Sequence, residues 1–338
     1  TANELVTVGS TTTELDAEAN LTYDGTTLTS ATAVQVQGGS GDTTLKLHRT
    51  NAAGSNGNHF GSIRWTDNNN NEVSSIRGER ATAVDDANLT FYTRTTGGSA
   101  AERLRITSAG LVGIGLDSPS SYSSGANNLV VNDASGAGGI TIVTPDDEQG
   151  SIFFSDGTGA TGRGRIRYNH TNDSLNFGTS NTENKLIIDS NGYVTKPSQP
   201  FFHAKGAAAW VAIDDADGNV DCPFSVEITD IGNNYNHSNY TFTAPVAGKY
   251  VFHVMLYWKT NTNNGYFQNY FTVNNGISNE RQHLWGYGTG APHEDQTSEA
   301  TLAINLAAND YVRFRLNVGG VDGDFYGGHS SFSGYLLQ

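Results

Sequence analysis

Large aromatic side chains are distributed very unevenly along this chain, and this distribution limits what each half can fold into. Residues 1–200 contain 11 Phe, Trp and Tyr residues, whereas the shorter stretch 201–338 contains 23. Each buried ring removes a large apolar area from water, so rings dominate the energetics of most cores. The second half can therefore form a core of its own. The first half needs neighbours that cover its few apolar side chains.

The composition favours strands joined by many tight turns. Only 36% of the residues are hydrophobic and 16% are charged, while 40 are Gly. Thr, Val, Tyr and Phe favour strands, and Gly and Asn supply turns. We therefore expect an all-β protein. We expect no membrane insertion, because no run of 18 apolar residues is present. The net charge of −15 opposes nucleic-acid binding.

An internal repeat occupies much of the first half. Three segments recur in the same order: Gly61–Asp67 as Gly150–Asp156, Asn88–Thr93 as Ser174–Thr179, and Leu104–Val112 as Leu186–Val194. Repeats that are poor in apolar residues usually bury their faces on neighbours. We therefore predict an elongated β stalk in which identical chains lie side by side. Two ordinary small β-sandwiches are the alternative.

The repeat and the aromatic-rich half together define the expected domains. Two prolines at 197 and 200 favour an extended joint. The predicted segments are an N-terminal β-hairpin or stem (1–40), stalk repeat 1 (41–117), stalk repeat 2 (118–197) and a C-terminal head (198–338).

Residues 201–338 alternate between aromatic or β-branched strands and polar turns, which is typical of a sandwich or jelly roll. A set of aromatic, acidic and Gly positions also resembles the signature of the globular head of complement component 1q: Phe224, Asp230, Tyr235, Phe242, Gly248, Tyr250 and Phe252. Val254 departs from that pattern, where Phe or Tyr is usual. The resemblance implies a jelly roll like that of tumour necrosis factor, assembled as a homotrimer.

The first half resembles a second family. The hairpin Leu21–Thr29 and the stretch Arg103–Gly115 are similar to bacteriophage tail-fibre repeats. Together the two resemblances imply a trimeric stalk that carries a trimeric head.

An acidic loop offers a candidate metal site. Oxygen-bearing side chains alternate at Asp215, Asp217, Asn219 and Asp221. Calcium prefers six to eight oxygen ligands. The loop lacks the glycine, the final glutamate and the flanking helices of an EF-hand. We expect no required cofactor, with calcium as the candidate ligand. A solvated acidic turn is the alternative.

Alternating basic residues form a stripe at Arg163, Arg165 and Arg167. Residues at alternate positions of a strand share one face. Such a stripe could hold an anionic glycan, but we expect it to pair with Asp or Glu of an adjacent chain. Glu183 and Asp189 belong to the same repeat.

Two aromatic segments of the head are the best candidates for recognition. Trp285 and Tyr287 flank a glycine in a predicted exposed loop. A second predicted loop combines acids, rings and an imidazole: Asp322, Asp324, Phe325, Tyr326 and His329. Aromatic faces beside polar groups suit sugar stacking, and core packing is the alternative.

These features predict a non-enzymatic, extracellular phage tail fibre that attaches the virion to a host-cell glycan or protein. The expected partners are two further copies of the chain, the host receptor, and a tail or baseplate protein that contacts a region preceding Thr1. A secreted or cell-surface lectin-like adhesin is the first alternative. A polysaccharide-degrading tail spike is the second, although no pair of carboxylates in the sequence indicates it.

Overall fold

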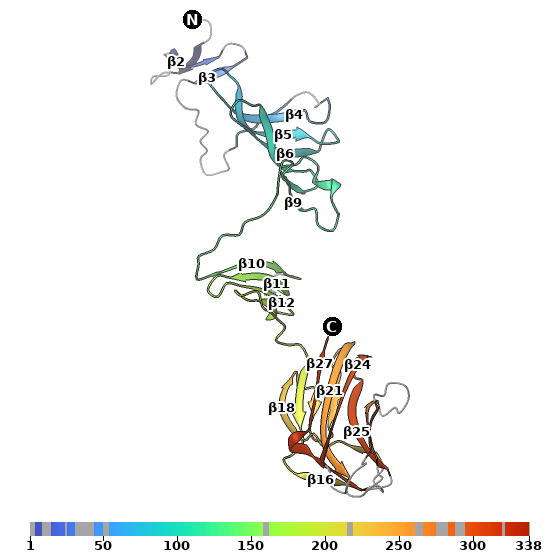
Figure 1. The fold of residues 1–338 in the computed structure, drawn as a ribbon. Coiled ribbons are helices and arrows are strands. Elements are labelled where there is room, and N and C mark those ends of the chain that lie inside the picture. The colour runs from blue at the N-terminus through green and yellow to red at the C-terminus, as the bar shows by residue number, and fades with distance from the viewer. Residues whose placement is uncertain are drawn as a thin grey trace. The chain divides into compact units, whose positions relative to one another are not determined.

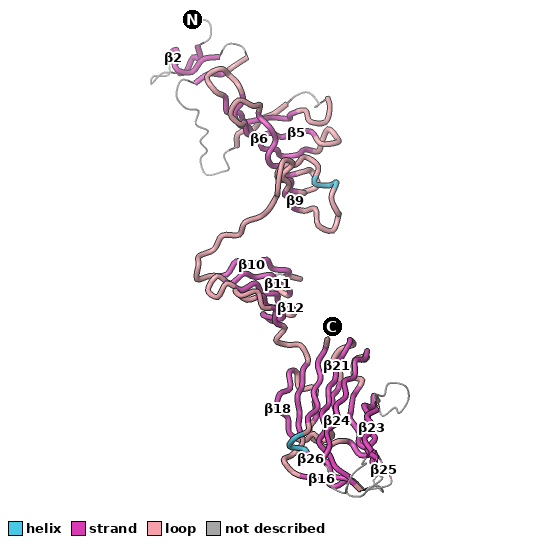
Figure 2. Tube along the Cα trace, in the orientation of Figure 1, coloured by secondary structure: helices cyan, strands magenta, loops and turns pink. Residues whose placement is uncertain are grey.

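The computed structural model describes residues 4–8, 15–23, 26–30, 44–49, 54–157, 162–214, 219–260, 266–274, 283–287, 295–319 and 322–337. Figure 2 shows that strands and turns dominate, and the helical segments within these residues are short 3₁₀ turns at Pro119–Ser121 and Gly327–His329. The predicted all-β class is confirmed. None of the described helical segments is long and apolar enough to cross a membrane.

The chain divides into two compact units, Thr1–Thr141 and Ile142–Gln338. The first unit begins with sheet A, which contains β1 (Glu4–Val8), β2 (Leu15–Tyr23) and β3 (Leu28–Ser30). β2 and β3 form an antiparallel pair, so a hairpin occupies the segment for which the sequence predicts one.

Sheet B follows in the same unit, and its strands pair in sequence order. They are β4 (His59–Thr66), β5 (Glu72–Arg80), β6 (Ala87–Arg94), β7 (Ala100–Ile106), β8 (Val112–Ile114) and β9 (Leu129–Val131). All neighbours are antiparallel except β8 and β9. β9 extends the sheet beyond residue 117, where we expected the first repeat to end.

Sheet C, in the second unit, is also an antiparallel meander in sequence order. Its strands are β10 (Gln149–Phe154), β11 (Gly164–Asn169), β12 (Ser174–Thr179), β13 (Thr182–Ile188) and β14 (Val194–Thr195). The segments that match in sequence occupy equivalent strands, because β4, β6, β7 and β8 correspond to β10, β12, β13 and β14.

One face of sheets B and C carries the same apolar ladder, in which each residue faces the next across a strand pair. The ladders are Ile63–Ile76–Phe91–Leu104 in sheet B and Ile152–Ile166–Phe177–Leu186 in sheet C. The outer members, Ile63 and Ile152, are 47% and 50% exposed. Trp65 and Phe154, two residues further along the same strands, are also exposed. Both ladders therefore leave apolar area in contact with water in a single copy.

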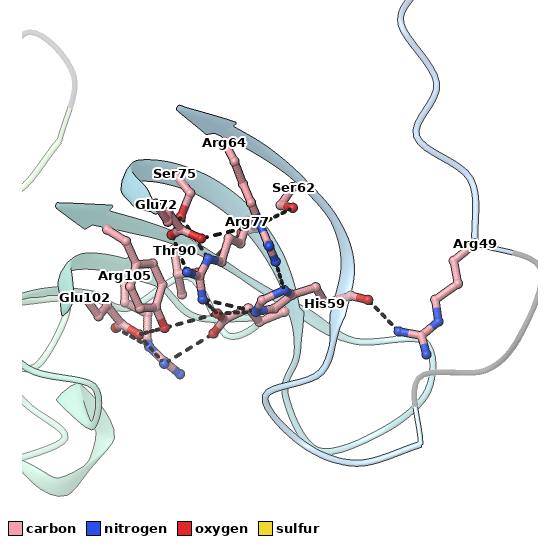
Figure 3. Close-up of polar contacts among 12 residues, drawn as sticks. Arg49, His59, Ser62, Arg64, Glu72, Ser75, Arg77, Thr90, Glu102 and Arg105 are labelled. Atoms are coloured by element: carbon pink, nitrogen blue, oxygen red, sulfur yellow. Dashed lines mark hydrogen bonds and ion pairs between the residues drawn. The ribbon is translucent and has the colours of Figure 1, made fainter. Parts of the chain in front are cut away.

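The opposite face of sheet B is polar, and its charged side chains pair with one another (Figure 3). Arg77 binds the Glu72 carboxylate, and its guanidinium lies 3.7 Å above the Tyr92 ring centre. The buried Glu79 lies 3.7 Å from Arg77 and 3.8 Å from Arg105 and accepts a 3.1 Å hydrogen bond from Tyr92. Burial, with the negative charge of Glu79, raises the pKa of Tyr92 to about 12. This face is stabilised within one chain.

The head consists of two sheets with jelly-roll-like connections (Figure 1). Sheet D contains β16 (Trp210–Ile213), β26 (Gly323–Tyr326), β21 (Gly248–Thr260), β27 (Ser331–Leu336), β15 (Phe201–Lys205) and β18 (Val226–Ile231), with β24 (Asp295–Leu306) also on β21. Sheet E contains β19 (Tyr235–Asn236), β20 (Thr241–Thr243), β25 (Tyr311–Gly319), β22 (Tyr266–Val273) and β23 (His283–Tyr287), with β17 (Asn219–Asp221) also on β25.

Aromatic rings fill the space between sheets D and E. Phe202 stacks on Tyr235 and Phe242 at centroid distances of 4.7 and 5.0 Å, and Phe332 meets it edge-on at 4.8 Å. All four side chains are buried. Burying each ring contributes roughly 1.5–3 kcal/mol, so the concentration of rings gives the head its own core.

Candidate functional site

Four rings gather on the face of sheet D that points away from the core. We call Trp210, Tyr257, Tyr326 and His329 the ring cluster. β16 and β21 provide the first two, and the other two come from the end of β26 and from the 3₁₀ turn that follows it. Side chains alternate across a strand, so the burial of Trp258 in the core places Tyr257 on the opposite face.

The rings contact one another at close range. Trp210 lies 5.1 Å from Tyr326 and 5.7 Å from Tyr257 between ring centroids. His329 lies 4.8 Å from Tyr326 and 5.2 Å from Tyr257, in edge-on geometry. Trp210 remains 40% exposed, so the cluster presents a large ring to solvent.

Charged groups border the rings. The Lys259 ammonium lies 4.2 Å from the Trp210 ring centre and 3.4 Å from the Asp324 carboxylate. Tyr257 donates a 2.6 Å hydrogen bond to Asp295, and this bond raises the pKa of the Tyr257 hydroxyl. The cluster therefore combines aromatic faces with a cation and two carboxylates.

Close backbone packing fixes the turn that carries His329. A side chain at Gly206 would come within 2.4 Å of the Gly327 backbone, so both positions require glycine. The buried Ser330 hydroxyl donates to the Tyr326 carbonyl and accepts from the Tyr257 amide, each at 2.8 Å. These bonds tie the turn to β21 and hold the rings of both elements in place.

The ring cluster lies at the end of the head that is remote from its attachment. Leu336, at the end of β27, bonds Pro200 just before β15, so the chain enters and leaves at one end. The 3₁₀ turn precedes β27 at the other end. Figure 1 likewise shows β16 opposite the C-terminus within the head.

The structure brings together part of the predicted recognition set. Two of the predicted residues, Tyr326 and His329, belong to the ring cluster, and Asp324 borders it. Asp322 is exposed immediately before β26. Phe325 differs from the prediction. It is fully buried and meets Phe224 edge-on at 5.9 Å, so it packs the core and is not available to a receptor.

The other predicted aromatic segment is a strand where the sequence predicted a loop. Trp285 and Tyr287 belong to β23, which pairs with β22 opposite Gln268 and Tyr266. Their side chains lie outside the described part of the structure, and their role in recognition stays a prediction.

The calcium loop is described only at its end. Asp215 and Asp217 and the side chain of Asn219 lie outside the described residues. Asp221 binds two arginines, at 3.1 Å to Arg313 and 2.7 Å to Arg315. Both carboxylate oxygens of Asp221 are therefore engaged by cations, which opposes a role as a calcium ligand. Among the described residues, no group of three or more His, Cys, Asp or Glu could hold a metal ion.

The basic stripe pairs within one chain, whereas we expected an adjacent chain to supply its partners. Arg165 and Arg167 bind the Glu183 carboxylate at 2.8 and 2.5 Å, and Arg163 binds Asp156 at 3.0 Å. β13 brings Glu183 to the face that carries Arg165 and Arg167.

Sequence reasoning missed Trp210, Tyr257 and Lys259. The alternating run Tyr250–Trp258 did indicate which residues face outward. Its even-numbered residues form the core, so its odd-numbered residues must point away from the core. The pairing of β16 and β21 with β26 could not be read from the sequence.

Comparisons with known proteins agree with the geometry of the head. Residues 209–337 match the C1q domain family, so the predicted C1q-like head is confirmed over this range. A search of curated proteins finds no match.

Similar solved structures include the globular domain of zebrafish complement 1qA protein, which is 14% identical over 41% of this chain and 98% of that chain, with a TM-score of 0.32. Eiger TNF from S. frugiperda is 15% identical over 41% and 94% of the two chains, with a TM-score of 0.30. Murine APRIL is 7% identical over 41% and 99%, with a TM-score of 0.31.

Proposed function

We propose that this protein is a homotrimeric phage tail fibre, exposed on the virion, whose C1q-like head attaches to a host-cell surface glycan or protein. The ring cluster is the observation that carries this proposal. Exposed rings beside fixed charges suit stacking on sugar faces and hydrogen bonding to hydroxyls, and they suit the aromatic-rich centres of protein interfaces equally well.

Apolar faces that are exposed in a single copy support the proposal of a trimer. The ladders of sheets B and C are exposed in one copy, and the outward face of sheet D adds the exposed ring of Tyr335. Additional copies supply the same faces, so association of identical chains can cover each of them. The resemblance of the head to the C1q family implies three copies.

The position of the ring cluster supports a role in attachment. It lies at the free end of the head, where the stalk does not obstruct access. Three copies in one assembly present three clusters, so weak individual sites gain strength through multivalency. The tail-fibre context rests on the resemblance of the N-terminal hairpin and repeats.

Replacing Trp210 tests the proposal. We expect Trp210→Ala to retain the mass and melting temperature of the wild-type assembly, because the side chain is 40% exposed. Binding of the purified chain to whole bacteria of a susceptible strain should fall at least tenfold, roughly the loss of one well-placed contact of 1.4 kcal/mol.

Tyr193→Ala is the matched control, because Tyr193 is an exposed ring outside the head. Equal cell binding by wild type and Trp210→Ala would refute a role for the ring cluster. A smaller mass for Trp210→Ala would assign the cluster to the contact between subunits. Trp285→Ala in the same assays tests the second predicted segment.

A further inference from the structure

The head has a cleft at an edge where residues of its two sheets lie close together. β18 is the last strand of sheet D and β19 the first of sheet E. A cleft of about 620 Å³ opens beside them, lined by Glu227 of β18, Asn236 of β19 and Thr243 of β20. Its volume lies within the range of small-molecule sites.

The lining of the cleft is rich in side-chain amides. Asn233, Asn234 and Asn309 add to Asn236. Asn234 donates one amide hydrogen to the Ile231 carbonyl and Asn236 accepts from the Ser238 amide, so each keeps its remaining donor or acceptor capacity for a ligand. The acidic side chain of the lining is Glu227, whose carboxylate lies 3.7 Å from the His237 ring. The Glu227 carboxylate can accept a hydrogen bond from a hydroxyl and opposes an anionic ligand.

The tyrosine of the lining is not available for stacking on a ligand. Tyr235 lines the cleft, but only 3% of it is exposed, and its hydroxyl donates to the Phe224 carbonyl at 2.9 Å. Its ring stacks on Phe202 in the core. A ligand in this cleft therefore meets hydrogen-bonding groups, in contrast to a ligand at the ring cluster.

The cleft is held rigid by backbone bonds. The Thr243 amide donates to the Asn234 carbonyl, and the Asn309 amide donates to the Ala244 carbonyl, each at 2.8 Å. Asn233 and Asn309 have φ angles of 56° and 72°. A preorganised wall reduces the entropy lost when a ligand binds.

We propose that this cleft, which we call the amide cleft, binds a neutral monosaccharide or disaccharide unit through hydrogen bonds to its hydroxyls. The donors and acceptors of the asparagine side chains match the neighbouring hydroxyls of a pyranose, and the Glu227 carboxylate favours a sugar without negative charge. The inference rests on the proposed function in one respect, that the head recognises a glycan. It adds a saccharide site separate from the ring cluster.

Saturation-transfer NMR on the full-length chain tests the amide cleft. The probes are free glucose, galactose, mannose, N-acetylglucosamine and, as an anionic comparison, N-acetylneuraminic acid. We expect at least one neutral sugar to bind. Thr243→Trp, which fills the cleft, should weaken that binding at least tenfold, and Asn233→Gly should weaken it without backbone strain because glycine accepts the positive φ.

Thr66→Trp is the matched control, a strand-end threonine of sheet B. Tyr193→Ala, which removes an exposed ring outside the head, should retain the neutral-sugar signal. Unchanged binding in Thr243→Trp, an absence of neutral-sugar binding in the wild type, or binding of the anionic sugar alone would overturn the proposal. None of these results depends on host cells, so loss of cell attachment in Trp210→Ala would still support the proposed function if the amide cleft failed.

Discussion

Adjacent aromatic residues of one strand in the head have different roles: one packs in the core, and the next faces outward. Trp258 is buried and donates its indole N–H to Ser298 at 2.8 Å, whereas Tyr257 next to it faces outward in the ring cluster. Phe325 and Tyr326 form a second such pair on β26. The sequence predicted both of these as receptor contacts, because spacing within a presumed loop does not reveal which ring faces the core.

The pair on β26 gives a prediction about stability. Phe325→Ala should destabilise the head by about 3–5 kcal/mol, the usual cost of removing a fully buried Phe. Tyr326→Ala should cost clearly less, because that ring is partly exposed. Urea unfolding of both variants, followed by near-ultraviolet circular dichroism, measures the difference. Equal losses would show that Phe325 does not pack as described.

His59 gives a prediction about pH. Burial, together with the nearby Arg77 charge, lowers the pKa of His59 below its usual 6.5. The unfolded chain therefore takes up a proton at a higher pH than the folded chain does. The stability that depends on neutral His59 is complete above pH 6.5 and is lost as the pH falls towards the folded pKa.

We expect the melting temperature of the first unit to fall as the pH is lowered from 6.5 towards 4.5. His59→Gln should reduce this slope, whereas His48→Gln, at an exposed position, should leave it unchanged. Glu72, whose pKa is also lowered, loses its contribution only below its usual 4.5, so it does not disturb this interval. An identical slope in His59→Gln and wild type would contradict the assignment.

At the scale of elements, sheets B and C combine one polar face with one apolar face. The strands of the repeat could be predicted, because alternating residues and turn residues follow the period of a strand. The pairing of Arg165 and Arg167 with Glu183 could not be predicted, because it depends on which strands become neighbours. The polar faces are satisfied within one chain, and the apolar ladders are therefore the surfaces available for association.

Two adjacent residues of β10 test the ladders. Ile152 and Phe153 are almost equally exposed, at 50% and 51%, but they lie on opposite faces. We expect Ile152→Asp to dissociate the assembly or to lower its melting temperature strongly, because a carboxylate would be buried between copies. Phe153→Asp lies beside Arg165 and Arg167 and should leave the assembly intact. Equivalent behaviour of the two variants in size-exclusion chromatography would contradict this role of the ladder.

In the whole molecule, the exposed apolar ladders favour association of copies. The head has an aromatic core of its own, as the distribution of rings predicted. The two repeat sheets expose apolar ladders that water does not stabilise. The positions of the ring cluster and the amide cleft could not be predicted, because each is built from strands that are distant in sequence.

The proposed association of three copies is tested by the mass of the full chain in solution, measured by multi-angle light scattering at micromolar concentration. We predict a single species at about three times the chain mass of 36.0 kDa, with a mass that stays constant on tenfold dilution. A monodisperse species near 36.0 kDa would contradict the trimer, because the ladders would then face water in the working protein.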